Sequence, residues 1–143
     1  MKGNRRLLAC LLLVVPIGLL GASLTFAWDQ AWLEVDDVTP ELGTVLNLEI
    51  FTNLAQNGHK CVLLAGSTPG PTMGIPVGGN IQMLGETTVA NSSAIFQLPI
   101  PKYPGLDGTV VYFAAITVDA VGSLTSVTNG VSVELIDQED IPG

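Results

Sequence analysis

Short runs of strand-forming residues, separated by glycine, proline, asparagine and aspartate, follow one another along this chain from about residue 31 onward. In residues 44–52 apolar and polar side chains alternate, and Leu46, Leu48 and Ile50 fall on one face. A period of two places one face of a strand in a core and the other in water. Apolar residues nowhere recur at helical spacing over a useful length of this region, so the sequence predicts an all-β protein.

Seven such runs are predicted to be strands. They cover residues 31–38, 44–52, 60–66, 80–84, 93–100, 109–119 and 129–136. Residues 109–119 are apolar on both faces, so burial on both faces is expected. The pair Asn57-Gly58 favours a tight hairpin turn, and the proline- and glycine-rich stretch 67–79 is predicted to be a surface loop. About seven strands in roughly 110 residues is the size and spacing of an immunoglobulin-like antiparallel β-sandwich.

The first 27 residues are typical of a secretory signal peptide. Three basic residues precede an apolar run over residues 7–20, and small residues lead to a cleavage point after Ala27. A retained membrane anchor is the alternative, because residues 7–27 are almost long enough to span a bilayer. The expected organisation is a signal peptide at 1–27, one sandwich domain at 28–137 and an acidic tail at 138–143.

Removal of the signal peptide makes the protein more acidic. The whole chain has a formal charge of −8, but afterwards only Lys60 and Lys102 remain against 13 acidic residues, a net charge of −11. Such a charge repels phosphate backbones and anionic lipid headgroups, so neither nucleic acid nor, after cleavage, a membrane is expected as a partner. Secretion to the exterior or the cell surface is expected, with the periplasm as the alternative.

The sequence contains no recognisable catalytic constellation. The only histidine, His59, lies beside the predicted turn with no acidic residue near it in sequence, and an exposed turn residue is expected there. Cys61 would be the single thiol after cleavage, and it lies in an apolar run that predicts a buried small hydrophobe. An intermolecular disulfide or a reactive thiol is the alternative for Cys61. We therefore expect a protein that is not an enzyme.

Two kinds of ligand site remain open. Calcium takes only oxygen ligands, and four aspartates near predicted strand ends are candidates, although turn capping or plain solvation would also explain them. These candidates are Asp36, Asp37, Asp107 and Asp119. Carbohydrate binding needs exposed aromatic side chains, for which Trp32 and Tyr103 are the candidates, whereas Tyr112 alternates with core residues and is expected to be buried. Core or strand-edge packing is the alternative for Trp32.

Two stretches carry a family resemblance. Residues 39–50 (TPELGTVLNLEI) resemble the Pro-x-x-Gly start of the second strand in bacterial Ig-like and fibronectin type III-like modules. Residues 112–123 and 128–133 resemble the last hairpin of these modules, in which a tyrosine-bearing strand ends in Asp-x-x-Gly and an asparagine opens the final strand. The middle of the chain looks like short exported bacterial proteins of unassigned function. The resemblance implies a fold and no activity, and the cysteine pair and core tryptophan of antibody domains are missing.

These expectations lead to one leading function and two alternatives. The leading one is a non-enzymatic secreted or cell-surface module with a structural, adhesion or protein-interaction role. A carbohydrate-binding module using Trp32 or Tyr103 is the alternative, and a calcium-stabilised extracellular module is the second. The expected partner is an extracellular protein or a glycan, with no cofactor other than calcium.

Overall fold

The computed structural model describes residues 29–137. The expected signal peptide and acidic tail lie outside the described residues. Within 29–137 the chain forms nine strands and two short 3₁₀ helices, which confirms the predicted all-β class. None of the described helices is long and apolar enough to cross a membrane.

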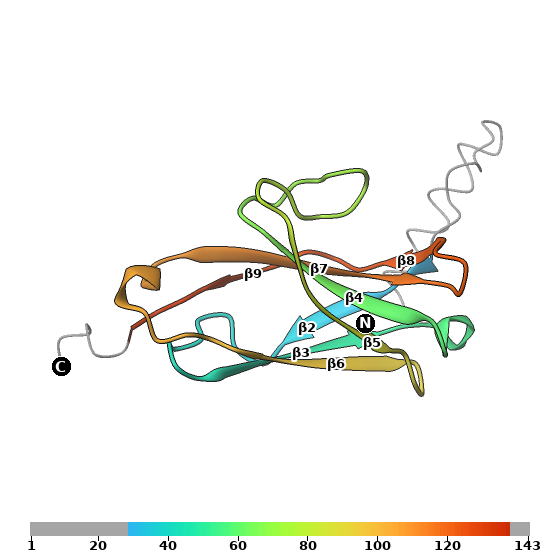
Figure 1. Cartoon of the computed structure of the whole chain (residues 1–143), viewed down its shortest axis with the longest axis horizontal. Helices are drawn as coiled ribbons and strands as arrows, with labels where there is room; N and C mark the ends of the chain where they lie inside the picture. Colours follow the sequence, from blue (N-terminus) through green and yellow to red (C-terminus); the bar gives the residue numbers. More distant parts are fainter. Residues whose placement is uncertain (1–28, 138–143) are drawn as a thin grey trace.

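The strands form two sheets whose arrangement fits a β-sandwich (Figure 1). The three-stranded sheet has the order β2-β3-β6, and the six-stranded sheet has the order β1-β8-β7-β4-β5, with β9 also paired to β7. The strands are β1 (Asp29–Gln30), β2 (Trp32–Val35), β3 (Val45–Phe51), β4 (Lys60–Gly66), β5 (Gln82–Thr88), β6 (Ser93–Pro99), β7 (Val110–Val118), β8 (Leu124–Val127) and β9 (Val131–Glu134), and the helices are η1 (Leu54–Gln56) and η2 (Pro104–Leu106).

The core lies between the two sheets. The alternation in β3 is confirmed, because Leu46, Leu48 and Ile50 are fully buried. Alternate residues of β2 and of the facing sheet complete the core, and the larger or central ones are Leu33, Cys61, Leu63, Phe113, Ala115 and Val133. The period of two in the sequence therefore predicted which face of β3 turns inward.

Burial on both faces is expected for the longest strand, β7, but the structure shows it for only part of the strand. Phe113 and Ala115 face the core, whereas on the other face Ala114 is buried, Tyr112 is half-buried and Val110 is 41% exposed. The expectation of a buried Tyr112 is therefore wrong. The physical reason is that the other residues of 29–137 cover this outer face of the six-stranded sheet incompletely.

The stretch 67–79 is a surface loop, as predicted. It rises from the end of β4 and returns to β5, and only isolated bridges cross it, between Thr68 and Gly78 and between Thr72 and Ile75 (Figure 1). A Cβ added at Gly78 would lie 2.6 Å from the Thr68 hydroxyl, so the two arms of the loop approach more closely than larger residues allow.

The predicted hairpin at Asn57-Gly58 is wrong. Gly58 does adopt a positive φ of 87°, and the His59 amide donates to the Gln56 carbonyl at 2.9 Å, so a tight turn is present. However, β3 and β4 belong to different sheets, and the turn carries the chain from one to the other. The dipeptide specifies a local turn, while pairing with β5 and β7 places β4 in the six-stranded sheet.

The strand prediction missed two elements and misplaced a third. Strands β1 and β8 were not predicted, so the chain has nine described strands where about seven were expected. Strand β8 lacks a hydrophobic pattern, because its buried positions include a serine, Ser126, whose hydroxyl bonds that of Thr117 at 2.5 Å. Strand β5 runs over Gln82–Thr88 instead of 80–84, because it is a largely exposed strand without an apolar pattern.

Candidate functional site

The outer face of the three-stranded sheet presents an ordered array of side chains. Because Leu46, Leu48 and Ile50 point inward, the residues between them point outward and align with neighbours on β2 and β6. Three cross-strand rows result: Trp32, Phe51 and Ser93; Glu34, Glu49 and Ile95; and Asp36, Asn47 and Gln97, the last row extending just beyond the end of β2.

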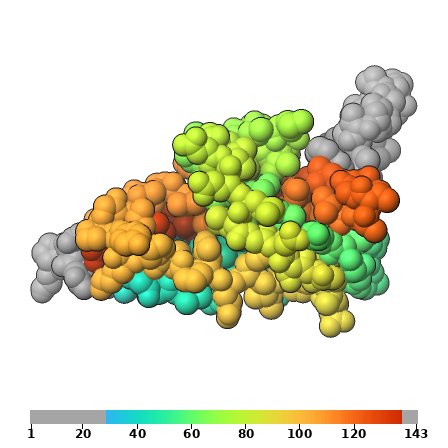
Figure 2. Space-filling model, in the orientation of Figure 1, coloured from blue at the N-terminus to red at the C-terminus, as the bar shows by residue number. Residues whose placement is uncertain are grey.

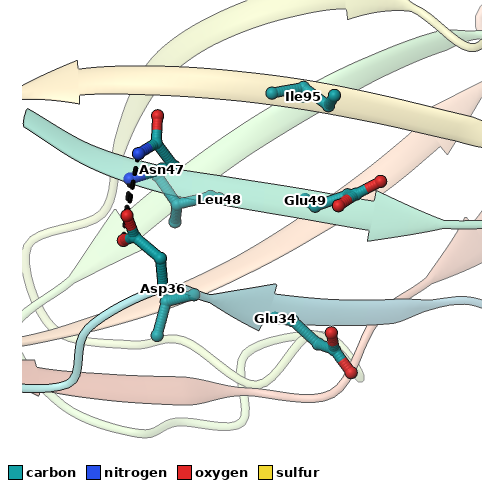
Figure 3. Close-up of a pocket in the computed structure, with 7 residues that line it drawn as sticks. Glu34, Asp36, Asn47, Leu48, Glu49 and Ile95 are labelled. Atoms are coloured by element: carbon teal, nitrogen blue, oxygen red, sulfur yellow. Dashed lines mark hydrogen bonds between the residues drawn. The ribbon is translucent and has the colours of Figure 1, made fainter.

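A shallow groove of about 350 Å³ opens on this face (Figure 3). Its lining comes from β2, β3 and β6 and the residue after β2, and consists of Glu34, Val35, Asp36, Asn47, Leu48, Glu49 and Ile95. Three of these seven residues are acidic and none is basic, and Ile95 is the exposed apolar side chain among them, so the groove presents carboxylates beside one apolar side chain.

Asp36 is fixed at one end of the groove. Its carboxylate accepts a hydrogen bond from Asn47 Nδ2 at 2.7 Å and another from the Asn47 amide at 3.0 Å (Figure 3). These two bonds, the side-chain one first, hold the pKa of Asp36 below its ordinary value of 3.8. Asp36 therefore stays ionised at neutral pH and joins β2 to β3 where the ladder between them ends.

Glu34 and Glu49 lie directly opposite each other in the register of β2 and β3. Like charges in that position repel, which makes the pair unfavourable for the sheet by itself. Trp32 Nε1 donates a hydrogen bond to Glu34 at 3.2 Å, and the Ser93 hydroxyl donates one to Glu49 at 3.1 Å; both donors are uncharged. We call Glu34 and Glu49 the acidic pair.

Neither lysine of the described region lines this groove. Lys60 lies on β4 in the other sheet and forms an ion pair with Glu86 at 2.9 Å. The aliphatic stem of Lys102 lies against Gly43, in the segment that leads into β3.

One long side of the sandwich is sealed by the chain itself. The Asn129 side chain accepts from the Leu33 amide at 2.7 Å and donates to the Leu33 carbonyl at 3.1 Å, which joins the connection between β8 and β9 to β2. Further along, the Glu134 amide donates to the Val38 carbonyl at 2.9 Å. Backbone and side-chain hydrogen bonds thus link the two sheets along this side.

The opposite side has two edge strands, β5 and β6, which lie at the surface in Figure 2. Within residues 29–137 no strand pairs with the outer edge of either one. The amide of Ile100 donates to Thr44 and that of Thr52 to Ser92, so even-numbered residues of β6 bond to β3. Hydrogen bonding alternates along an antiparallel strand, so Ile95 and Gln97 direct their amide and carbonyl groups away from β3.

The four calcium candidates are not brought together. Among residues 29–137 no group of three or more His, Cys, Asp or Glu side chains is arranged to hold a metal ion. Each aspartate instead accepts hydrogen bonds from backbone amides: Asp36 from Asn47, Asp37 from Thr39, Asp107 from Asp137, and Asp119 from Val121 and Ser123. The bonds to Asp37 and Asp119 cap local turns, as short acidic side chains commonly do, whereas those to Asp36 and Asp107 join segments farther apart in the chain.

The two aromatic candidates lie at opposite ends of the three-stranded sheet. Trp32 is half-buried opposite Phe51, at the end of β3, whereas Tyr103 is 66% exposed in the loop that follows β6. Pro99, four residues before Tyr103, pairs with the first residue of β3, so the length of β3, about 20 Å, separates the two regions. Trp32 and Tyr103 therefore do not form one aromatic platform.

Cys61 and His59 occupy different surroundings. Cys61 is fully buried, as predicted, and its burial raises the pKa of the thiol to about 12. His59 is half-buried instead of exposed, because its Nδ1 lies 2.9 Å from the Thr125 hydroxyl, which is itself 2.7 Å from the Thr117 hydroxyl. The expectation of an exposed turn histidine is wrong, because β8, which was not predicted, lies beside the turn.

The acidic pair and the open edge of β6 escaped the sequence analysis. Both depend on strand register, and no single stretch of sequence displays them. No protein-family model matches the chain, and no curated protein matches it with significance. The geometry of this face and edge therefore carries the functional argument.

Proposed function

We propose that this chain is a non-enzymatic, exported module of the immunoglobulin-like or fibronectin type III-like kind that binds or assembles with extracellular proteins. The strand order supports the fold assignment. A β2-β3-β6 sheet packs against a sheet in which the chain runs through β4, β7 and β8 as neighbours, and the first strand pairs in parallel with a late one, β8. This order is compatible with a Greek-key sandwich.

The functional proposal rests on a difference between the two long sides of the sandwich: hydrogen bonds close one of them, and the other has unpaired strand edges among the described residues. An unpaired strand edge invites pairing with another chain, and monomeric proteins usually block it with charge, proline, bulges or covering loops. Here one side is sealed, whereas β6 offers Ile95 and Gln97 without a covering strand among the described residues. Strand addition at such an edge is a common mode of protein recognition.

Fractionation of producing cells tests the proposal, with the size of the native protein measured in each fraction. We expect wild-type protein in a cell-retained or high-molecular-weight form. Gln97→Pro removes an amide that points outward from an edge strand, where proline is tolerated, so it should release folded monomer. Gln97→Val keeps the amide and should behave as wild type. A freely secreted wild-type monomer, or a Gln97→Pro protein of unchanged size, would contradict the proposal.

Carbohydrate binding is the second candidate, and the first cross-strand row favours it. Trp32 and Phe51 lie side by side across β2 and β3, next to the hydrogen-bonding acidic pair. An aromatic surface flanked by carboxylates suits a sugar ring. If a glycan is the ligand, Trp32→Ala should abolish binding on a glycan array while Tyr103→Ala leaves it intact, and an array without signal for the wild type removes this candidate.

A further inference from the structure

From the open edge of β6 and the groove beside it we infer the chemistry of the partner: an extended segment in which cationic and apolar side chains alternate, added as a fourth strand to the three-stranded sheet. This inference rests on the proposed function, because it assumes binding at that edge. It adds which side chains the edge of β6 selects in the bound segment.

The backbone of β6 sets the length and position of the added strand. Ile95 and Gln97 offer outward amide and carbonyl groups, and Pro99, without an amide, ends the usable edge. At the other end the Ser93 amide is already bonded to the Ala90 carbonyl at 3.0 Å. A segment of about five residues thus pairs with β6, at the usual strand spacing of about 4.8 Å.

The outer face of the added strand favours cationic side chains. A residue opposite Ile95 continues the row of Glu34, Glu49 and Ile95, and its Cβ lies about 10 Å from that of Glu49, two strand spacings away. The stem of a lysine or arginine would cover Ile95, which is 59% exposed, while its charged head reaches the Glu49 carboxylate. A cation there also offsets the repulsion within the acidic pair.

The inner face of the added strand favours apolar side chains. Phe96 and Leu98 pack against the core but remain only half-buried, because β6 is the last strand of its sheet. Alternate residues of the added segment point to the same side and would complete their burial. The edge therefore selects for cationic residues on one side of the segment and apolar residues on the other.

A second copy of this chain supplies no such segment from its described residues. Lys60 is the first residue of β4 and pairs with Glu86 of β5 in the other sheet, and Lys102 stands between prolines in the stretch Pro101-Lys102-Tyr103-Pro104. The charge complementarity points instead to a different, basic protein, which a chain with a net charge of −11 after signal removal also attracts at long range.

The test uses a fluorescent synthetic heptapeptide of alternating valine and lysine, with a valine–glutamate heptapeptide as control. The purified protein should bind the lysine peptide and not the glutamate peptide, with affinity falling as salt is raised. Amide chemical shifts should move in β6 and β3 and not in β5. Glu49→Gln should weaken binding about five- to tenfold, and Gln97→Pro should abolish it.

Glu86→Gln is the matched control, because it removes one carboxylate from the other edge strand and should leave binding unchanged. Equal binding of both peptides, shifts confined to β5, or an equal effect of Glu86→Gln would overturn the inference. So would a self-association that Gln97→Pro abolishes in purified protein, since the occupant would then be a second copy. If the native protein shows an edge-dependent assembly but ignores the lysine peptide, the partner chemistry fails while the proposed function stands.

Discussion

Asn129→Ala should destabilise the sandwich more than its position in a connection would suggest. The side-chain amide of Asn129 bonds to β2 as the backbone of a neighbouring strand would: its oxygen accepts from the Leu33 backbone amide, and its nitrogen donates to the Leu33 carbonyl. Leu33 is buried, so water cannot readily replace these bonds. Two lost bonds at about 1 kcal/mol each, plus part of the penalty for a buried unsatisfied amide, give a loss of about 2–3 kcal/mol in the free energy of unfolding.

Urea unfolding followed by tryptophan fluorescence measures this loss, because Trp32 precedes Leu33 in β2. The midpoint should fall while the slope stays constant, and the melting temperature should drop by about 10 °C. Hydrogen exchange should accelerate at the Leu33 amide and not in the β3–β6 ladder. Asn80→Ala is the control, since only the backbone amide of this exposed residue has a described hydrogen bond. A loss below about 0.5 kcal/mol, or unchanged exchange at Leu33, would refute the reasoning.

Three further predictions concern single residues. Because burial raises the pKa of the Cys61 thiol to about 12, iodoacetamide should alkylate it at pH 8 only in denaturant, and rapid labelling of native protein would contradict the buried position. Gly70→Ala would place a Cβ only 2.4 Å from a backbone carbonyl oxygen of the same loop, at a positive φ of 71°, whereas the Cβ of Gly58→Ala, at φ 87°, meets no atom within 4 Å. Calorimetry should therefore show a larger drop in melting temperature for Gly70→Ala than for Gly58→Ala. Equal drops would count against the close approach at Gly70. The hydrogen bonds from Asn47 depress the folded-state pKa of Asp36, so its stabilisation is present above about pH 4 and is lost as the pH falls through the lowered pKa. Asp36→Asn should therefore be less stable than wild type at neutral pH, with the gap closing in acid; a gap that stays constant across the titration would show that another interaction is responsible.

Local patterns predicted the central strands because burial there is simple. Leu46, Leu48 and Ile50 alternate with polar residues and occupy one buried face, as the period of two requires. The same logic missed β8, where Ser126 is buried through a hydroxyl pair, and misplaced β5, whose exposed edge position imposes no apolar period. A polar strand that satisfies its hydrogen bonds internally leaves no hydrophobic signal in the sequence.

Single candidate residues could be identified from the sequence, but their grouping could not. Asp36 and Trp32 do lie on the face that we propose as functional, yet Asp107, Asp119 and Tyr103 lie elsewhere and serve as caps or loop residues. Asp107 bonds to Asp137, 30 residues away, and Trp32 lies opposite Phe51 on another strand, so no spacing rule relates the candidates.

The sequence by itself determined the all-β class, the inward face of β3, the loop at 67–79 and the buried state of Cys61. These follow from local backbone preference and hydrophobic period, which act between near neighbours. Only the tertiary structure decided that the Asn57-Gly58 turn crosses between sheets, that Glu34 faces Glu49, and that residues 29–137 close one side of the sandwich while leaving the edge of β6 unpaired. Those features depend on register and sheet order, and the packing of residues far apart in the chain fixes both.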